Sequence, residues 1–174
     1  RTARQGDIRY PVEWDSLGTY LEWLEARGVS PNVASFLSFD TVRIATVGRD
    51  DRPPSPAALD SMRGKVARAM EEGALGMATA LIYAPSTYAG TAELTELMKV
   101  SARHGGMYIS HIRSESDRLL EAIDELIAIA RSAGCPAEVY HLKAAGSRNW
   151  PKMDAVLDRI EAARASGLSI TADH

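Results

Sequence analysis

The sequence has very little cysteine, which excludes an internal disulfide. Cys135 is the only cysteine among 174 residues, and a lone thiol fits a reducing compartment, so the expected location is the cytoplasm. The sequence also has no apolar run of the roughly 18 to 20 residues that a membrane-spanning helix requires. We therefore expect a chain that neither crosses a membrane nor depends on disulfides.

No charge of one sign dominates the sequence. The chain carries 20 lysines and arginines against 23 acidic residues, with a formal net charge of −3. These charges are interspersed, so no basic patch is present to attract nucleic acid or an anionic membrane surface. No glycine-rich phosphate loop of the GxGxxG or Walker type follows any apolar stretch. Nucleic acid, membrane and nucleotide partners are therefore not expected.

The sequence does contain a repeating alternation of helical and extended patterns. Each apolar segment with helical spacing is followed by a glycine, which can end a helix in a left-handed conformation. The predicted helices centre on residues 17–24, 59–70, 94–101, 119–130 and 156–163, with Ser55, Thr91, Ser116 and Asn149 as N-cap candidates. The predicted strands are residues 33–38, 74–79, 106–111, 137–142 and 168–174.

Apolar strands separated by helices predict a parallel sheet that is buried on both faces. The last four units recur every 30 to 33 residues, a spacing shared by βα barrels and doubly wound sheets. The absence of a phosphate loop favours the barrel. We predict an α/β fold in which residues 1–174 form a single domain, with about four to five βα units of a (β/α)8 TIM barrel. Segments 1–13 and 48–56 are the expected irregular stretches.

Two of the four histidines fall where a parallel sheet places its chemistry, at the carboxyl ends of strands. His111 ends one predicted strand and His141 lies near the end of the next, whereas His104 precedes a glycine on the opposite face. Neighbouring strands are about 4.8 Å apart, so the two imidazoles could meet at one metal ion. Imidazole suits zinc, and a hydrolytic zinc site keeps one position open for water. The pattern alone leaves open that each histidine only ends a strand and bonds to a loop.

Charged residues near His111 have several possible roles. Arg113 and Glu115 could pair with each other, position the loop beyond the strand or contact a substrate. The charged residues at 117–125 are expected to form a solvated helix face. Cys135, between a helix end and a strand start, is expected to be a partly buried structural thiol. His174 is left without a role.

The ordered blocks ALGMATALIYAP, SHIRSE, HLKAAG and TAD, with the spacing of His111 to His141, resemble the N-acyl-D-amino-acid deacylase (D-aminoacylase) family of amidohydrolases. The resemblance runs from about residue 10 to the end. It implies that the chain is the central part of an amidohydrolase barrel with both flanks missing. It further implies that His111 and His141 bind Zn²⁺ and that Tyr83 and Lys143 line the substrate pocket. We add Arg113 to the candidate substrate-binding residues.

The resemblance implies metal-dependent hydrolysis of N-acyl-D-amino acids to a D-amino acid and a carboxylate. The family's paired histidines, bridging cysteine and late aspartate, which transfers the proton, have no counterpart in this sequence. Cys135 cannot replace that cysteine because it is expected on the face away from the histidines. The catalytic residue therefore stays unassigned, and residues 1–174 alone are expected to be inactive.

Two other functions stay open. One is an amidohydrolase of the hydantoinase or dihydroorotase type, which acts on cyclic amides. Such enzymes generally use a carboxylated lysine between two metals, but no lysine ends a strand ahead of His111, and Lys99 lies in a predicted helix. The other is a noncatalytic βα remnant, which metal binding would distinguish. The sequence does not indicate the preferred side chain or acyl group, the number of metal ions or the oligomeric state.

Overall fold

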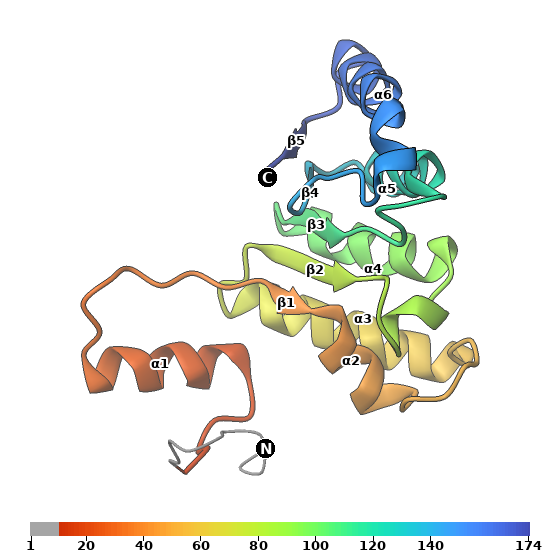
Figure 1. The fold of residues 1–174 in the computed structure, drawn as a ribbon. Coiled ribbons are helices and arrows are strands. Elements are labelled where there is room, and N and C mark those ends of the chain that lie inside the picture. The colour runs from red at the N-terminus through yellow and green to blue at the C-terminus, as the bar shows by residue number, and fades with distance from the viewer. Residues whose placement is uncertain (1–10) are drawn as a thin grey trace.

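The computed structural model describes residues 11–174 as a parallel sheet with helices packed beside it (Figure 1). Residues 1–10 of the predicted irregular lead-in lie outside the described residues. The strands are β1 (Leu37–Ser38), β2 (Gly76–Ala80), β3 (Met107–His111), β4 (Ala137–Val139) and β5 (Ile170–Ala172). The helices are α1 (Leu17–Arg27), α2 (Phe39–Thr46), α3 (Pro56–Glu71), α4 (Thr91–Arg103), α5 (Leu119–Ala133) and α6 (Met153–Ala165), with short 3₁₀ helices η2 (Ser86–Tyr88) and η3 (Ser147–Lys152).

The strands lie in chain order, β1-β2-β3-β4-β5, and each neighbouring pair is parallel. A doubly wound sheet reverses its strand order at a switch point, so this sequential order is that of a barrel segment. Helices α3, α4, α5 and α6 pack against one another in the same order. The predicted α/β fold built from consecutive βα units is confirmed, and the carboxyl ends of β3 and β4 are neighbours.

The core lies between the strands and helices α3 to α6. Most of the apolar residues whose helical spacing predicted these helices point into it, whereas Leu157 of α6 is exposed. Burying such a side chain contributes about 1.5–3 kcal/mol, so this packing fixes the strands that carry the site. Fully buried members include Met62, Val66, Met77, Leu94, Leu97, Tyr108, Ile123 and Val139. None of the described helices is both long and apolar enough to span a bilayer.

Three strands are clearly shorter than their apolar stretches predict, and β5 keeps only Ile170–Ala172 of segment 168–174. Segment 33–38 contributes only two strand residues before the chain enters α2, a helix that the periodicity did not predict because its eight residues are too few to show repeated spacing. Segment 137–142 pairs only as far as Val139. His141 has a φ of 39°, a left-handed backbone that cannot continue a strand. His141 therefore lies in the turn beyond β4.

Only one of the four predicted helix caps is correct. The hydroxyl of Ser55 accepts the backbone N–H of Ala58 at the start of α3. Helix α4 begins at Thr91 itself, α5 begins beyond Ser116 with no side-chain cap, and Asn149 lies within η3. These three residues form other hydrogen bonds or lie in loops. The spacing of apolar residues does not indicate where a helix begins to within a few residues, so it could not identify the caps.

Candidate metal centre

His111 is held at the end of β3 by the neighbouring strand. Its carbonyl accepts the backbone N–H of Leu81 at 2.9 Å, and its side chain is only 17% exposed. Burial lowers the pKa of His111, and the charges of His141 and Lys143 lower it further, while the carboxylate of Glu115 opposes them. The imidazole is therefore neutral at neutral pH, which leaves a lone pair available to a metal.

His141 reaches the same place from the turn after β4. Its backbone N–H donates to the carboxylate of Asp173, and the backbone N–H of Leu142 donates to the Asp173 carbonyl at 2.7 Å. A left-handed backbone costs a non-glycine residue about 1–3 kcal/mol unless its surroundings hold it. The residue after β5 supplies that support, so the position of His141 depends on the strand beyond it.

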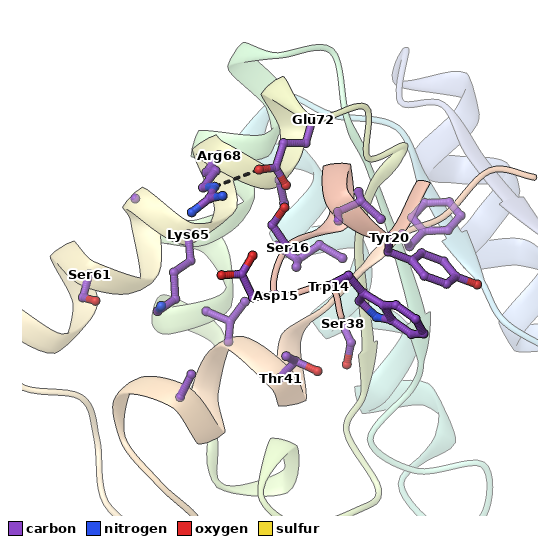
Figure 2. Close-up of a pocket in the computed structure, with 17 residues that line it drawn as sticks. Trp14, Asp15, Ser16, Tyr20, Ser38, Thr41, Ser61, Lys65, Arg68 and Glu72 are labelled. Atoms are coloured by element: carbon purple, nitrogen blue, oxygen red, sulfur yellow. Dashed lines mark hydrogen bonds and ion pairs between the residues drawn. The ribbon is translucent and has the colours of Figure 1, made fainter. Parts of the chain in front are cut away.

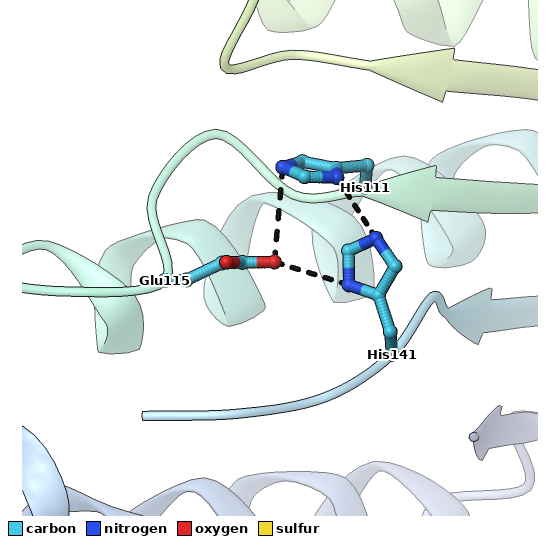
Figure 3. A group of neighbouring side chains, drawn as sticks. All are labelled: His111, Glu115 and His141. Carbon is cyan, nitrogen blue, oxygen red and sulfur yellow. Dashed lines mark hydrogen bonds and ion pairs between the residues drawn. The ribbon is translucent and has the colours of Figure 1, made fainter. Parts of the chain in front are cut away.

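The two imidazoles meet edge to edge (Figure 3). Nδ1 of His111 lies 2.9 Å from Nε2 of His141, and the rings are nearly perpendicular, at 81°. We call these two atoms the inner nitrogens, and Nε2 of His111 and Nδ1 of His141 the outer nitrogens. Two nitrogens bound at 2.0–2.1 Å to a tetrahedral zinc ion lie about 3.3 Å apart. The inner nitrogens are therefore within a few tenths of an ångström of the spacing that a shared ion requires.

Glu115 completes this group from the loop after β3. Its Oε1 lies 3.1 Å from the outer nitrogen of His141 and 3.7 Å from that of His111. His111, Glu115 and His141 each offer a ligand atom within 4.8 Å of the others. Nε2 of His111 is buried without a hydrogen-bond partner, as expected where a further group binds. Two imidazole nitrogens at this spacing fit a zinc ion, whereas Nε2 of His111 lies at the outer edge of its ring, away from the inner nitrogens.

Two predicted substrate-binding residues border the histidine pair. The ring of Tyr83 is 60% exposed and lies 5.3 Å from that of His111, measured between centroids. Nζ of Lys143 lies 2.7 Å from Nδ1 of His141 and 2.8 Å from Oε1 of Glu115. Both side chains reach solvent, so a molecule bound at the pair would meet an aromatic ring and a cation.

Arg113, the third predicted substrate-binding residue, contacts other residues than the histidine pair. Its guanidinium binds both carboxylate oxygens of Glu125, at 2.8 and 3.0 Å, and donates to the carbonyls of Thr87 and Ala89. Pairing of Arg113 with Glu115, one of the sequence alternatives, is therefore wrong. The solvated face predicted for 117–125 is wrong at Glu125, whose side chain is 13% exposed. Arg113 ties the loop after β2 to α5, and a substrate contact by it stays a prediction.

The remaining histidines and the cysteine lie apart from this centre. His104 is exposed at the end of α4, and His174 is exposed after β5. Cys135 precedes β4 and is 5% exposed, and burial raises the pKa of its thiol to about 11. The thiol is thus buried and protonated at neutral pH, as a structural role requires.

A cavity of about 690 Å³ lies between α1, α2 and α3 (Figure 2). Its walls include Trp14, Tyr20, Lys65 and Arg68, and no residue of β3 or β4 lines it. It contains neither histidine of the pair, so we place the candidate site at the histidines and not in this cavity.

Sequence and structure comparisons cover about nine tenths of the chain, although no family model matches it. N-acyl-D-glutamate deacylase from Alcaligenes xylosoxydans xylosoxydans is 36% identical over 157 residues, which cover 90% of this chain and 32% of that protein. N-acyl-D-glutamate deacylase from Bordetella bronchiseptica, crystallised with zinc and a phosphonate mimic of the tetrahedral intermediate, is 34% identical with a TM-score of 0.87. A D-aminoacylase with a binuclear metal centre is 29% identical with a TM-score of 0.86.

Each of these two structural alignments covers 91% of this chain and 33% of the other. The chain thus spans about a third of the length of the relatives it matches. Over that third it is similar in sequence and in fold to the N-acyl-D-amino-acid deacylases, so the resemblance seen in its motifs is confirmed.

Proposed function

We propose that the protein carrying this chain is a zinc-dependent hydrolase that cleaves the amide of N-acyl-D-amino acids, giving a carboxylate and a D-amino acid. One observation supports this most strongly: the inner nitrogens of His111 and His141 lie 2.9 Å apart at the carboxyl ends of neighbouring parallel strands. Barrel enzymes carry their catalytic groups at that end. Relatives that share this fold are deacylases, and one binds zinc together with an intermediate mimic.

In this proposal His111 and His141 hold the ion. A bound zinc ion would supply Lewis-acid chemistry, polarising the amide carbonyl and lowering the pKa of a coordinated water toward about 7. Lys143 presents its ammonium group to the substrate carboxylate, and Tyr83 forms an aromatic wall beside it. The carboxylate that transfers the proton is assigned to no residue of this chain. Residues 1–174 would form the central part of the barrel and would be inactive alone.

The proposed partner is a small molecule, since the balanced charges favour neither nucleic acid nor a membrane surface. We place the protein in the cytoplasm, and the lone thiol of Cys135 supports a reducing compartment.

Hydrolysis assays on the protein expressed from its complete reading frame test this function. N-acetyl-D-glutamate and N-acetyl-D-aspartate would be compared with their L enantiomers and with hydantoin and dihydroorotate. We expect release of the D-amino acid only, abolished by a chelator and by His111→Ala. Turnover of the cyclic amides alone, or no turnover by a zinc-loaded protein, would contradict the proposal.

A further inference from the structure

The carboxylate of Glu115 lies against the outer edges of the two imidazoles (Figure 3). One oxygen, Oε1, lies at ion-pair distance from both rings, 3.1 Å from Nδ1 of His141 and 3.7 Å from Nε2 of His111. The inner nitrogens face each other on the other side of the rings. Glu115 therefore meets the nitrogen of His141 that the shared ion would not use.

The chemistry of imidazole gives this contact a consequence. A neutral ring has one N–H and one lone pair. When the outer nitrogen of His141 carries the hydrogen and donates it to Glu115, the lone pair must lie on the inner nitrogen. Metal-binding histidines commonly donate their second N–H to a carboxylate in this way, which fixes both the tautomer and the ring orientation.

Lys143 binds the same carboxylate oxygen, with its Nζ at 2.8 Å. Nζ also lies 2.7 Å from the outer nitrogen of His141, but an ammonium group offers only donors. Once that nitrogen carries a hydrogen, Oε1 of Glu115 is the acceptor that remains for both neighbours. Glu115 thus positions the candidate ligand and the candidate substrate cation together.

The backbone fixes the carboxylate in this place. The carbonyl of Glu115 accepts the N–H of Ala145 at 2.7 Å, which joins the loop after β3 to the loop after β4. The Glu115 side chain is only 15% exposed. Its contact with His141 is therefore part of the folded structure, unlike that of a freely rotating surface acid.

We propose that Glu115 is a positioning residue of the metal centre, an outer-sphere carboxylate that orients His141 and Lys143 without binding the ion. This inference rests on the proposed function, in which His111 and His141 hold a metal. It assigns Glu115 a role that the sequence left open among pairing with Arg113, holding the loop and contacting substrate.

Zinc affinity of the full-length protein, measured by competition with a chromophoric chelator, tests the proposal. Glu115→Gln keeps the shape of the side chain and removes its charge, and we expect zinc binding to weaken about 10- to 100-fold. The control is Glu121→Gln, because Glu121 is 64% exposed and pairs with Arg118 on the surface. The control should keep the parent's affinity. Unchanged affinity in Glu115→Gln would overturn the proposal.

Two spectroscopic readouts separate positioning from other roles. Proton–nitrogen NMR correlations of the metal-free protein should show His141 protonated at Nδ1, and Glu115→Gln should mix the two tautomers. The absorption spectrum of the cobalt-substituted protein should be the same in the parent and in Glu115→Gln. A changed cobalt spectrum would make Glu115 a direct ligand, and an unchanged tautomer would remove the orienting contact, so either result overturns the inference.

A variant that is shorter by one methylene guards against a folding defect. If Glu115→Gln fails to fold, Glu115→Asp should bind zinc with an affinity between those of the parent and of His141→Ala, and parental affinity would overturn the proposal. Loss of zinc in His141→Ala, with no effect of Glu115→Gln, would reject this inference alone. No effect of His141→Ala would reject the proposed function as well.

Discussion

Nδ1 of His111 lies 2.9 Å from Nε2 of His141, although 30 positions separate the two residues in the sequence. The strand β3 places the first ring, and a left-handed turn after β4 places the second. That turn is held by Asp173, which follows β5. The pair therefore depends on three consecutive βα units, and its geometry requires the sheet to be correctly assembled.

Close approach of β2 to β3 leads to a first prediction, about Gly76. Its φ is 150°, and a Cβ added there would lie 1.9 Å from the carbonyl oxygen of Met107. Gly76→Ala should therefore lower the free energy of unfolding by several kcal/mol, or prevent folding. Gly64→Ala is the control, because that helical position has no neighbour within 4 Å and alanine there should stabilise by up to about 1 kcal/mol.

Urea unfolding followed by far-UV circular dichroism measures both changes. The two alanine variants should shift stability in opposite directions. Equal stability of Gly76→Ala and the parent would contradict the close backbone contact between β2 and β3.

Replacement of Arg113 by lysine separates its two possible roles. Lysine keeps the charge but cannot form the two-pronged contact with Glu125, so Arg113→Lys should cost about 1–3 kcal/mol of stability. Amide hydrogen exchange should also accelerate in the loop after β2, whose carbonyls at Thr87 and Ala89 lose a donor. Arg118→Lys, with a side chain 69% exposed, should change neither quantity. A raised KM with unchanged stability and exchange would support the predicted substrate contact instead.

Burial of Cys135 predicts that its thiol reacts slowly. Its pKa is raised from 9.0 to about 11, which lowers the thiolate fraction at pH 8 about a hundredfold. The thiol should react with a disulfide reagent much more slowly in the native protein than in guanidinium chloride. The native rate should keep rising with pH until about pH 11. A native rate equal to the unfolded rate at pH 8 would show an exposed thiol.

Much of the fold could be predicted because burial imposes a period on the sequence. Residues such as Leu94, Leu97 and Ile123 recur at helical spacing and are all fully buried. Apolar patterning also placed His111 at a strand end, through the short apolar run at 106–111. It could not reveal α2, which is too short for a period, or the end of β4, because the left-handed backbone of His141 depends on Asp173 from another strand.

Contacts between side chains of different loops could not be predicted from the sequence, for a related reason. Glu115 meets Lys143 only because the loops after β3 and β4 lie side by side, joined by the Ala145 N–H. Likewise, nothing in the SHIRSE motif indicates that Arg113 turns toward Glu125 on the following helix. Charged residues carry no period, so their contacts follow from the finished fold.

Zinc content decides most directly whether His111 and His141 share a metal ion. The protein expressed from its complete reading frame would be compared with His111→Ala, His141→Ala and, as a control, His104→Ala, by elemental analysis after dialysis. Each change at the pair should remove the zinc ion that the pair holds, whereas His104→Ala should keep the parent's content. Parental zinc content in both variants of the pair would show that the two imidazoles bind no common ion.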